Sequence, residues 1–420
     1  MLLFRKPKHI FRFFIQRKVD EIYYSVGLRR FAGQLIGLYE PIFLYLFFGK
    51  DLSKTLFFFA AIMGLYILFV PWGAKMMARF GVKHNMIFSI PTLIGYYLCL
   101  FLLDKIFWLI FLAPILAALT RAFFLPAFHA DFAKLSQKRK RGKQLGILQI
   151  ITIAGSIIGP LLGALILAKF GFSVLFVIVA VIFFLSAIPL MLTYEAKPRY
   201  RDSYQETWKR IFSKRWRKKA LSLVFYGFDS GINVNIWPLF LFYLGIQFGK
   251  MGLIASASLV FSLAATLYVA HLADKKKPIK LFRIGCFIAS VANIAKTFVK
   301  MFLGAFFAQS FFLIGDTLDT LPLTAHIYDK TQKEKINIGR FIMFREIAQN
   351  LGTFLIYLFA GIFFLFSNKI FIVFPIAAVS LLLAGILSRS FEKGFIENIE
   401  TFREELGKKI ILNPDKNENK

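Results

Sequence analysis

Residues 146–164 read GILQIITIAGSIIGPLLGA. The stretch has no charged side chain, and Gly155, Gly159 and Gly163 recur four residues apart, on one face of a helix. Helices inside a bilayer gain little from apolar burial, so a face of small residues that lets two backbones approach closely attracts them to each other. Pro160 lacks an amide donor and loosens the helix there. The stretch predicts a bent, tightly packed helix, either at a seam between two moving bundles or as an ordinary packing helix.

The composition extends this interpretation to the whole chain. Of its 420 residues 58% are hydrophobic, and the mean hydropathy is +0.64. Apolar runs of roughly 18–25 residues recur, which is the length that crosses about 30 Å of hydrocarbon. The net charge of +30 falls in alternate loops, a positive-inside pattern that favours a membrane protein over a nucleic-acid-binding one. Cys99 and Cys286 lie in separate apolar runs, so neither a disulfide framework nor a metal site is expected.

The apolar runs predict an all-α membrane protein with twelve transmembrane helices. Lys and Arg are concentrated before the first run and after every second one, so both termini are predicted to be cytoplasmic, in a bacterial-type plasma (inner) membrane. The approximate spans are 31–49, 54–74, 85–103, 106–127, 144–168, 172–193, 220–246, 251–271, 281–299, 302–325, 339–366 and 369–388.

The predicted spans form two pseudo-symmetric six-helix bundles. An internal repeat supports the division, because Leu125-Pro126 falls on Leu321-Pro322 at an offset of 196 residues. Two parallel six-helix repeats are typical of secondary transporters. The predicted organisation is a basic interfacial segment at 1–30, the first bundle at 31–193, a cytoplasmic loop at 194–219, the second bundle at 220–388 and a cytoplasmic tail at 389–420.

Two loops resemble signatures of the major facilitator superfamily, and the resemblance covers essentially the whole chain. Residues 270–275, AHLADK, are similar to the G-x-L-A-D-R/K-x-G signature that follows span 8. Residues 77–83, MARFGVK, form a degenerate copy after span 2, with Ala78 at the acidic position. The resemblance implies that these loops lock the two bundles together through Asp274, Lys275, Arg79 and Gly81.

The opening stretch resembles the span 5 antiporter signature of the same family, G-x8-G-x3-G-P-x2-G-G. The final glycine of the signature is replaced by Ala164. The resemblance implies a proton-coupled exporter of the drug/proton antiporter branch and names no substrate. The five matching positions are Gly146, Gly155, Gly159, Pro160 and Gly163.

Charged and polar side chains inside the predicted spans are few, and each is a functional candidate because it is costly in hydrocarbon. The charged candidates outside span 11 all fall on spans 1, 4, 7 and 10, which the resemblance places around a central cavity. The proton-coupling candidates are Glu40, Asp316 and Asp319. The substrate-cavity candidates are Arg121, Asp229, Asn233 and Trp237. The ion-pair candidates are Arg345 and Glu346.

Each candidate also has a structural alternative. Glu40 is either a carboxylate that alternates between protonated and ionised forms, or a protonated side chain bonded to a neighbouring helix. Arg121 modulates that carboxylate, contacts an anionic substrate or makes a structural ion pair. Arg345 either neutralises a span 10 aspartate as part of the site or forms with Asp319 a pair that only stabilises the bundle.

Several other polar residues lie near the ends or the middle of spans. His129 and His326 are interpreted as interfacial, with pH sensing as the alternative. The Trp237-Pro238 pair breaks span 7 and predicts either a gating bend, with the indole stacked on substrate, or plain packing.

These features predict a monomeric secondary active transporter that exports an organic or amphipathic solute by alternating access, coupled to protons, with no cofactor and no enzymatic activity. Its expected partners are a small-molecule substrate, protons and the lipid bilayer, not nucleic acid. The absence of a Walker A loop disfavours transport driven by ATP. The alternatives are an uptake carrier for a sugar, nucleoside or lipid precursor, an intramembrane enzyme using His129 and Asp131, and a membrane scaffold without flux.

Overall fold

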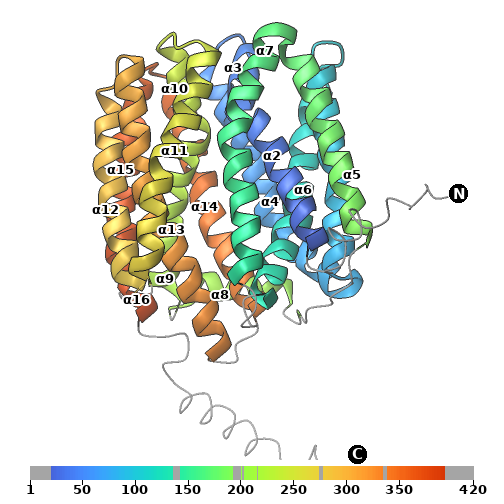
Figure 1. The fold of residues 1–420 in the computed structure, drawn as a ribbon, viewed down its shortest axis with the longest axis vertical. Coiled ribbons are helices and arrows are strands. Elements are labelled where there is room, and N and C mark those ends of the chain that lie inside the picture. The colour runs from blue at the N-terminus through green and yellow to red at the C-terminus, as the bar shows by residue number, and fades with distance from the viewer. Residues whose placement is uncertain are drawn as a thin grey trace, which may run out of the picture.

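The computed structural model describes residues 20–135, 142–192, 200, 203–214, 216–273, 278–333 and 338–392. Within these ranges every regular element is a helix, and the helices run side by side along the long axis of the molecule (Figure 1). The prediction of an all-α protein is confirmed for this part of the chain.

The first half of the described chain ends with a helix that doubles back. The helix α7 contains Gly171 at φ 77°, a left-handed conformation that favours glycine and that breaks the helical geometry. In Figure 1 the chain rises along one arm of α7 and descends along the other. The helices of this half are α2 (Asp20–Ile36), α3 (Glu40–Phe47), α4 (Leu52–Phe80), α5 (Val82–Leu102), α6 (Leu109–Leu135) and α7 (Gly142–Leu192).

The second half begins with a helix that widens in its middle. A π-helical turn, η1, comes directly before Trp237 and Pro238, where the proline supplies no amide hydrogen to an α-helical ladder. The helices of this half are α9 (Arg217–Gly231), η1 (Ile232–Ile236), α10 (Trp237–Tyr243), α11 (Phe248–Ala273), α12 (Pro278–Thr297), α13 (Phe302–Lys333), α14 (Ile338–Phe364), η2 (Ile370–Ile372), α15 (Val373–Leu387) and α16 (Arg389–Glu392).

Seven described segments are long and apolar enough to cross a membrane. The prediction of twelve spans goes further, because it also counts the interrupted segments 20–47 and 217–243, both arms of α7, and the helices α11 and α13. The count of twelve and the side on which the termini lie therefore stay predictions. The seven segments are Leu52–Phe80, Val82–Leu102, Leu109–Ala130, Ala154–Met191, Pro278–Thr297, Gly339–Phe364 and Ile370–Phe391.

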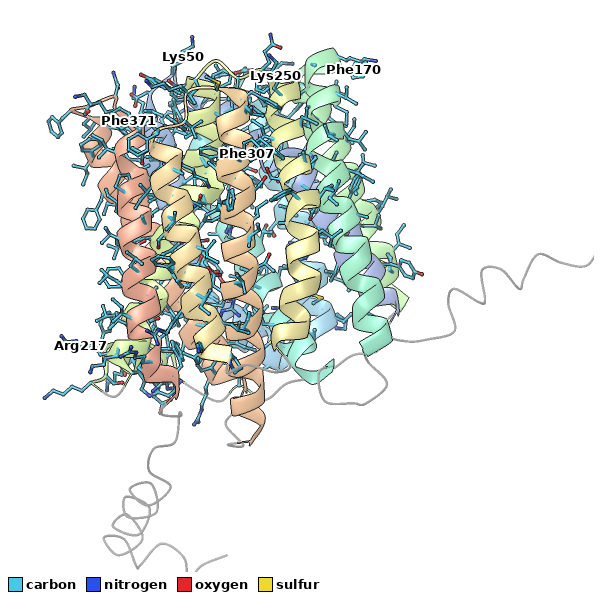
Figure 2. The ribbon with its side chains drawn as sticks, turned by 60° about the vertical axis from the view of Figure 1, so that its left-hand side comes forward. Lys50, Phe170, Arg217, Lys250, Phe307 and Phe371 are labelled. Atoms are coloured by element: carbon cyan, nitrogen blue, oxygen red, sulfur yellow. The ribbon has the colours of Figure 1, made fainter. Side chains whose placement is uncertain are left out.

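The outer surface matches a lipid environment. Large apolar side chains such as Phe307 and Phe371 are 47% and 41% exposed and point away from the bundle (Figure 2). Lys50, in the bend between α3 and α4, and Lys250, in the first turn of α11, lie at one end of the molecule, and Arg217 lies at the other (Figure 2). Apolar surface of this extent between polar ends is stable in a bilayer rather than in water.

The two halves meet mainly along two pairs of helices, with smaller contacts between α6 and α14 and between α3 and α10. α4 packs against α14, and α7 packs against α11. On the first of these contacts, a Cβ added at Gly361 of α14 would lie 2.8 Å from the ring of Phe57 on α4. On the second, a Cβ added at Gly252 of α11 would lie 2.7 Å from the carbonyl oxygen of Pro160 on α7. Small residues thus bring the two halves into close contact.

The glycine stripe of α7 packs inside the first half. A Cβ added at Gly163 would lie 2.0 Å from the carbonyl oxygen of Leu35 on α2, and one at Gly159 would lie 2.6 Å from Cβ of Gln34. The stripe therefore holds α7 against α2, and Pro160 beside it faces α11 of the other half.

Two ranges that were interpreted as lying outside the bundles contain helix. α2 begins at Asp20, so the end of the predicted interfacial segment continues into the first bundle helix. The predicted inter-bundle loop contains a further helix, α8 (Tyr204–Phe212), which contacts α4 and α14. It starts with a capping box, in which Ser203 Oγ accepts from the Glu206 amide at 3.1 Å and Glu206 Oε2 accepts from the Ser203 amide at 2.7 Å.

Candidate functional site

A cavity of about 400 Å³ lies in the first half, between α2, α3, α4, α5, α6 and the second arm of α7. All of its lining residues belong to this half, and its charged ones are three arginines and one glutamate. Glu40 and Arg121, predicted from separate spans, both line it. The structure therefore brings a proton-coupling candidate and a substrate candidate to one site.

Glu40 is placed in the cavity by a break between α2 and α3. α2 ends at Ile36, and α3 begins with Glu40, followed by Pro41 in its first turn. The hydroxyl of Tyr39 donates to the carbonyl oxygen of Pro160 at 2.6 Å, which anchors the break to α7. The prediction treated this region as one continuous span, and the interruption is what turns the carboxylate toward α5.

Two tyrosines of α5 bind the carboxylate. The Tyr96 hydroxyl donates to Oε1 of Glu40 at 2.8 Å, and the Tyr97 hydroxyl donates to Oε2 at 3.4 Å. An ionised carboxylate is a pure acceptor, so two hydroxyl donors satisfy it in a site of low dielectric. The same hydroxyls also accept, so the site can hold the protonated form after a local rotation of the O–H groups.

Three arginines face the cavity. Arg29 of α2 donates from Nη1 to Ser89 Oγ at 2.9 Å, and its guanidinium lies 3.8 Å from the ring centre of Phe124. Arg30 lies 5.5 Å from the ring centre of Phe128. Arg121 of α6 makes no hydrogen bond and no ion pair with any residue that the structure describes, although it lies in the electrostatic field of Glu40.

A second polar cluster lies within the second half. Oδ1 of Asp229 accepts from Asn293 Nδ2 at 2.6 Å and from Asn233 Nδ2 at 2.8 Å. Asn233 Oδ1 in turn accepts from the ammonium of Lys296, which is completely buried. The ammonium lies 4.5 Å from the ring centre of Trp237. The substrate candidates of span 7 therefore bind one another and a lysine of α12.

The aspartates of α13 lie beside this cluster. Asp319 is 1% exposed and accepts from the Tyr226 hydroxyl at 3.1 Å and from Thr320 Oγ1 at 3.0 Å. Asp316 is half-buried, and one of its oxygens lies 3.4 Å from the Thr320 hydroxyl. Within the described ranges no ion pair joins either aspartate to Arg345, whose Nε is buried without a hydrogen-bond partner.

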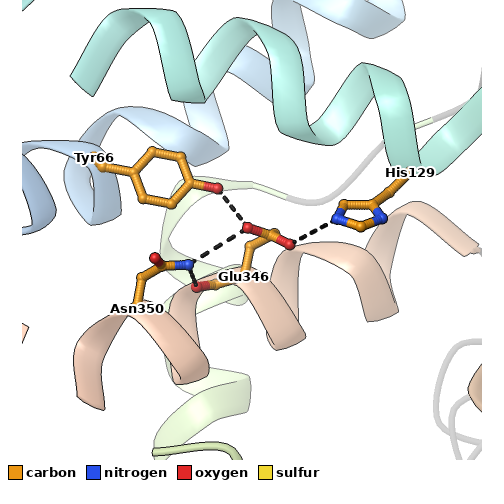
Figure 3. A network of polar contacts seen from close by, with 4 residues as sticks. All are labelled: Tyr66, His129, Glu346 and Asn350. Atoms are coloured by element: carbon orange, nitrogen blue, oxygen red, sulfur yellow. Dashed lines mark hydrogen bonds and ion pairs between the residues drawn. The ribbon is translucent and has the colours of Figure 1, made fainter. Parts of the chain in front are cut away.

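A polar bridge joins the two halves at the edge of the cavity (Figure 3). Glu346 of α14 is 6% exposed, and its Oε1 lies 3.2 Å from Nε2 of His129 on α6. The Tyr66 hydroxyl of α4 donates to Glu346 Oε2 at 2.6 Å, and Asn350 Nδ2 donates to the backbone oxygen of Glu346 at 2.8 Å. His129, interpreted as an interfacial residue, and Glu346, proposed as an ion-pair candidate, thus form a contact between halves.

The remaining predicted residues lie apart from these three groups. Arg79 lies 5.3 Å from the ring centre of its neighbour Phe80, and Gly81 ends α4 at φ 102°. Asp274 and Lys275 lie outside the described residues, so the lock between loops stays a prediction.

The predicted site is thus divided between the halves. The prediction was one shared polar pocket, whereas the structure shows one cluster in each half and a bridge between them. The charged and amide residues that the sequence missed include Arg29, Arg30, Asn293 and Lys296, and the tyrosines that bind Glu40 and Glu346 were missed as well. Arg29 and Arg30 were assigned to the basic segment before span 1. Asn293 and Lys296 lie three apart inside predicted span 9, a signal that was present in the sequence.

Comparisons with known proteins agree with this architecture. A sequence model of the Major Facilitator Superfamily matches residues 24–315. A protein of Bacillus subtilis (strain 168), named an uncharacterized MFS-type transporter, YuxJ, is 30% identical over 130 residues. That match covers 31% of this chain and 30% of the relative, so it spans less than a third of either protein.

Solved structures share the fold at low identity. The major facilitator transporter FucP in the outward conformation matches with a TM-score of 0.62 and 15% identity, over 88% of this chain and 97% of that chain. A bacterial homologue of the iron transporter ferroportin in an inward-facing state matches with a TM-score of 0.66 and 14% identity, over 90% and 99%. At these identities the likeness shows the fold alone.

Proposed function

The chain belongs to the major facilitator superfamily, a family of membrane transporters rather than enzymes, and on that premise we propose that it is a proton-coupled exporter of an organic solute. The two halves rock about the cavity of Glu40 and Arg121 so that it opens to each side of the membrane in turn. The proposed setting is a bacterial-type inner membrane, with the protein as a monomer.

The observation that carries the proposal is the environment of Glu40. A carboxylate in a membrane-embedded cavity is costly and marks a functional site by default. Here it lines a cavity large enough for a solute, and both of its oxygens contact tyrosine hydroxyls that suit its ionised and its protonated form. A group that can hold a proton beside the solute is what coupling requires.

The contacts between the halves support alternating access. α4 and α14 meet through small and aromatic residues, and the bridge from Glu346 to Tyr66 and His129 adds polar contacts between the halves (Figure 3). A few polar bonds over a closely packed apolar seam form a contact that can be broken without unfolding either half. The bridge thus acts as a gate beside the cavity.

The direction of transport is taken from α7. Its glycine stripe binds α2, where Glu40 follows, and Pro160 on the adjacent face touches Gly252 of the second half. This helix therefore contacts both the helix pair that carries the proton site and the moving partner. Together with the antiporter-like spacing of Gly155, Gly159 and Gly163, this position supports export in exchange for protons.

Proteoliposomes filled with the pH dye pyranine test the proposal. A panel of organic solutes is added outside at equal initial pH, and an exporter running in reverse takes up the solute, releases protons and makes the interior more alkaline. We expect Glu40→Gln to insert normally and to abolish this response. Glu206→Gln is the matched control, since it lies outside the spans and glutamine preserves the capping box. A solute response in Glu40→Gln equal to that of the unaltered protein would remove Glu40 from the mechanism.

Uptake together with protons is the second candidate. It is favoured by the arginines that share the cavity with Glu40, because protonation of the carboxylate favours an anion bound beside it. A proton and a solute that bind together cross in the same direction. In the same assay an interior that turns acidic on addition of solute selects uptake over export.

A further inference from the structure

We propose that the cavity in the first half binds an organic anion, with its head group on Arg121 and Arg29 and its apolar body against the neighbouring phenylalanines. The proposal rests on the transport function above and adds the charge of the solute to it. The binding experiment described below, read together with the proteoliposome assay above, separates it from the question of proton coupling.

The charges that line the cavity do not balance. Arg29, Arg30 and Arg121 contribute three guanidinium groups, and Glu40 contributes one carboxylate. No carboxylate that the structure describes makes an ion pair with any of the three arginines. Uncompensated cations within a membrane-embedded bundle are costly, and a bound anion is the partner that removes this cost.

Arg121 is the group best placed to hold the anion. It lines the cavity and makes no hydrogen bond with any described residue, so its five N–H donors are not committed to the protein. A guanidinium binds a carboxylate or phosphate through two parallel hydrogen bonds. Its neighbour Thr120 is bound to Thr92 at 2.8 Å and to a backbone carbonyl of α6, which fixes this turn of the helix.

Arg29 reaches the cavity from α2. Its guanidinium carbon lies 3.8 Å from the ring centre of Phe124, on the helix of Arg121, and its Nη1 donates to Ser89 Oγ. The remaining donors are free of described partners and lie in the same cavity as Arg121. A stacked arginine loses little further freedom when it binds an anion.

The rest of the lining suits an apolar body. Phe124, Phe128 and Phe183 line the cavity together with aliphatic side chains. A volume of about 400 Å³ is near the lower end of pockets that hold small molecules. The solute is therefore a compact anion with a ring or a short alkyl group.

The same geometry disfavours a cation. Glu40 is the carboxylate a cation would need, but Tyr96 and Tyr97 already contact both of its oxygens. A cation would also have to enter beside the three guanidinium groups. An anionic head on an apolar body can be supplied by a water-soluble solute or by a phospholipid, and the test includes both sources.

The test measures equilibrium binding to the purified full chain in a neutral detergent, by thermal stabilisation and by calorimetry. The probes are 2-naphthyl phosphate, 2-naphthoate, 2-naphthylmethylammonium and dioleoylphosphatidylglycerol. We expect an anionic probe to bind and the ammonium probe not to bind. A soluble naphthyl anion that binds identifies a water-soluble solute as the source, whereas binding of the phospholipid alone identifies a lipid head group.

Charge variants make the result specific. Arg121→Gln is expected to weaken anion binding roughly 10- to 100-fold, the loss of a charged hydrogen-bonding partner. Glu40→Gln removes the negative charge and is expected to bind the anion at least as tightly as the unaltered protein. Arg217→Gln is the control, since this exposed arginine lies at the end of the molecule opposite Lys50 and Lys250 and does not line the cavity (Figure 2). Arg29→Gln replaces Arg121→Gln if that variant fails to elute as a single species.

The outcomes separate the two proposals. Binding of the ammonium probe that is lost in Glu40→Gln overturns the anion proposal and leaves proton coupling at Glu40 intact. Anion binding unchanged in both arginine variants, or no stabilisation by any anionic probe, also overturns it. If anion binding depends on Arg121 while the Glu40→Gln variant still moves protons in the proteoliposome assay, the solute is an anion as proposed. Only the assignment of Glu40 as the proton-coupling residue is then overturned.

Discussion

Replacing Lys296 by methionine removes the buried ammonium beside Asp229, and we expect it to destabilise the protein by about 3–5 kcal/mol, the cost of leaving one partner of a buried charged group alone. The ammonium donates to Asn233, a charged hydrogen bond worth about 1.5–3 kcal/mol. It also lies 3.9 Å from the ring centre of Phe312 and 4.5 Å from that of Trp237, a desolvated contact worth about 2 kcal/mol. These contributions fall in the same range.

A double-mutant cycle gives the decisive comparison. Methionine fills the volume of the lysine stem, so the loss measured for Lys296→Met is mainly the loss of charge. Asp229→Asn leaves the lysine without its counter-charge, and the double variant removes both charges. The assay is unfolding by guanidinium in mixed micelles, followed by tryptophan fluorescence. We expect the double variant to be markedly more stable than the sum of the two losses implies. Strictly additive losses, or a stable Lys296→Met variant, would refute the assignment of these groups as partners.

Two further predictions concern the packing between helices. Tyr66→Phe removes a hydroxyl that donates to Glu346 across the two halves, a loss of about 1.5–3 kcal/mol. We expect it to lower the population of the closed state, measured as a longer distance between spin labels on the two halves. An unchanged distance distribution contradicts the role of the bridge as a gate. Gly352→Val is expected to lower the melting temperature because a Cβ there would lie 1.9 Å from the carbonyl oxygen of Val224. Gly249→Ala, which meets open space, is its control, and equal melting temperatures for the two variants contradict this account.

The helical fold followed from the sequence because lipid imposes a simple rule. Backbone groups in hydrocarbon must bond within the segment, so a long apolar run has to be a helix. The rule says less about interruptions. The interruption at η1 was expected from Trp237-Pro238, whereas the break after Ile36, just before Pro41, was not, and span 1 was predicted to be continuous. Ser203 and Glu206 have the spacing of a capping box, but the helix that they start was missed because the whole range 194–219 was interpreted as a charged loop.

The candidate site was predictable as a set of residues and not as an arrangement. Glu40 and Arg121 were identified because charges in apolar runs are costly. Their shared cavity depends on the contact of α2 with α7 and of α5 with α6, which no local pattern encodes. Arg29 was missed because it was included in the predicted basic segment 1–30, and a charge just before a span looks the same in the sequence whether it faces water or a cavity.

Lys296 was missed for a related reason. It lies near the end of predicted span 9, where lysine usually extends toward the interface. The structure buries it because Asn233 and two aromatic rings provide a place for the ammonium inside the bundle. Whether such a lysine extends to the interface or is buried in the bundle depends on partners on other helices, and these partners were not evident from one sequence.

The central claim is that the cavity of Glu40 and Arg121 opens to each side of the membrane in turn. Thr120 lines this cavity, so Thr120→Cys, made in a chain whose buried Cys99 and Cys286 are replaced by alanine, reports on access to it. Proteoliposomes of uniform orientation are treated with a membrane-impermeant maleimide added outside or trapped inside. The account predicts labelling from both sides, and less labelling from the gated side when the bridge at Glu346 is intact than in Tyr66→Phe. Labelling from one side only, in both proteins and under every gradient, would contradict it.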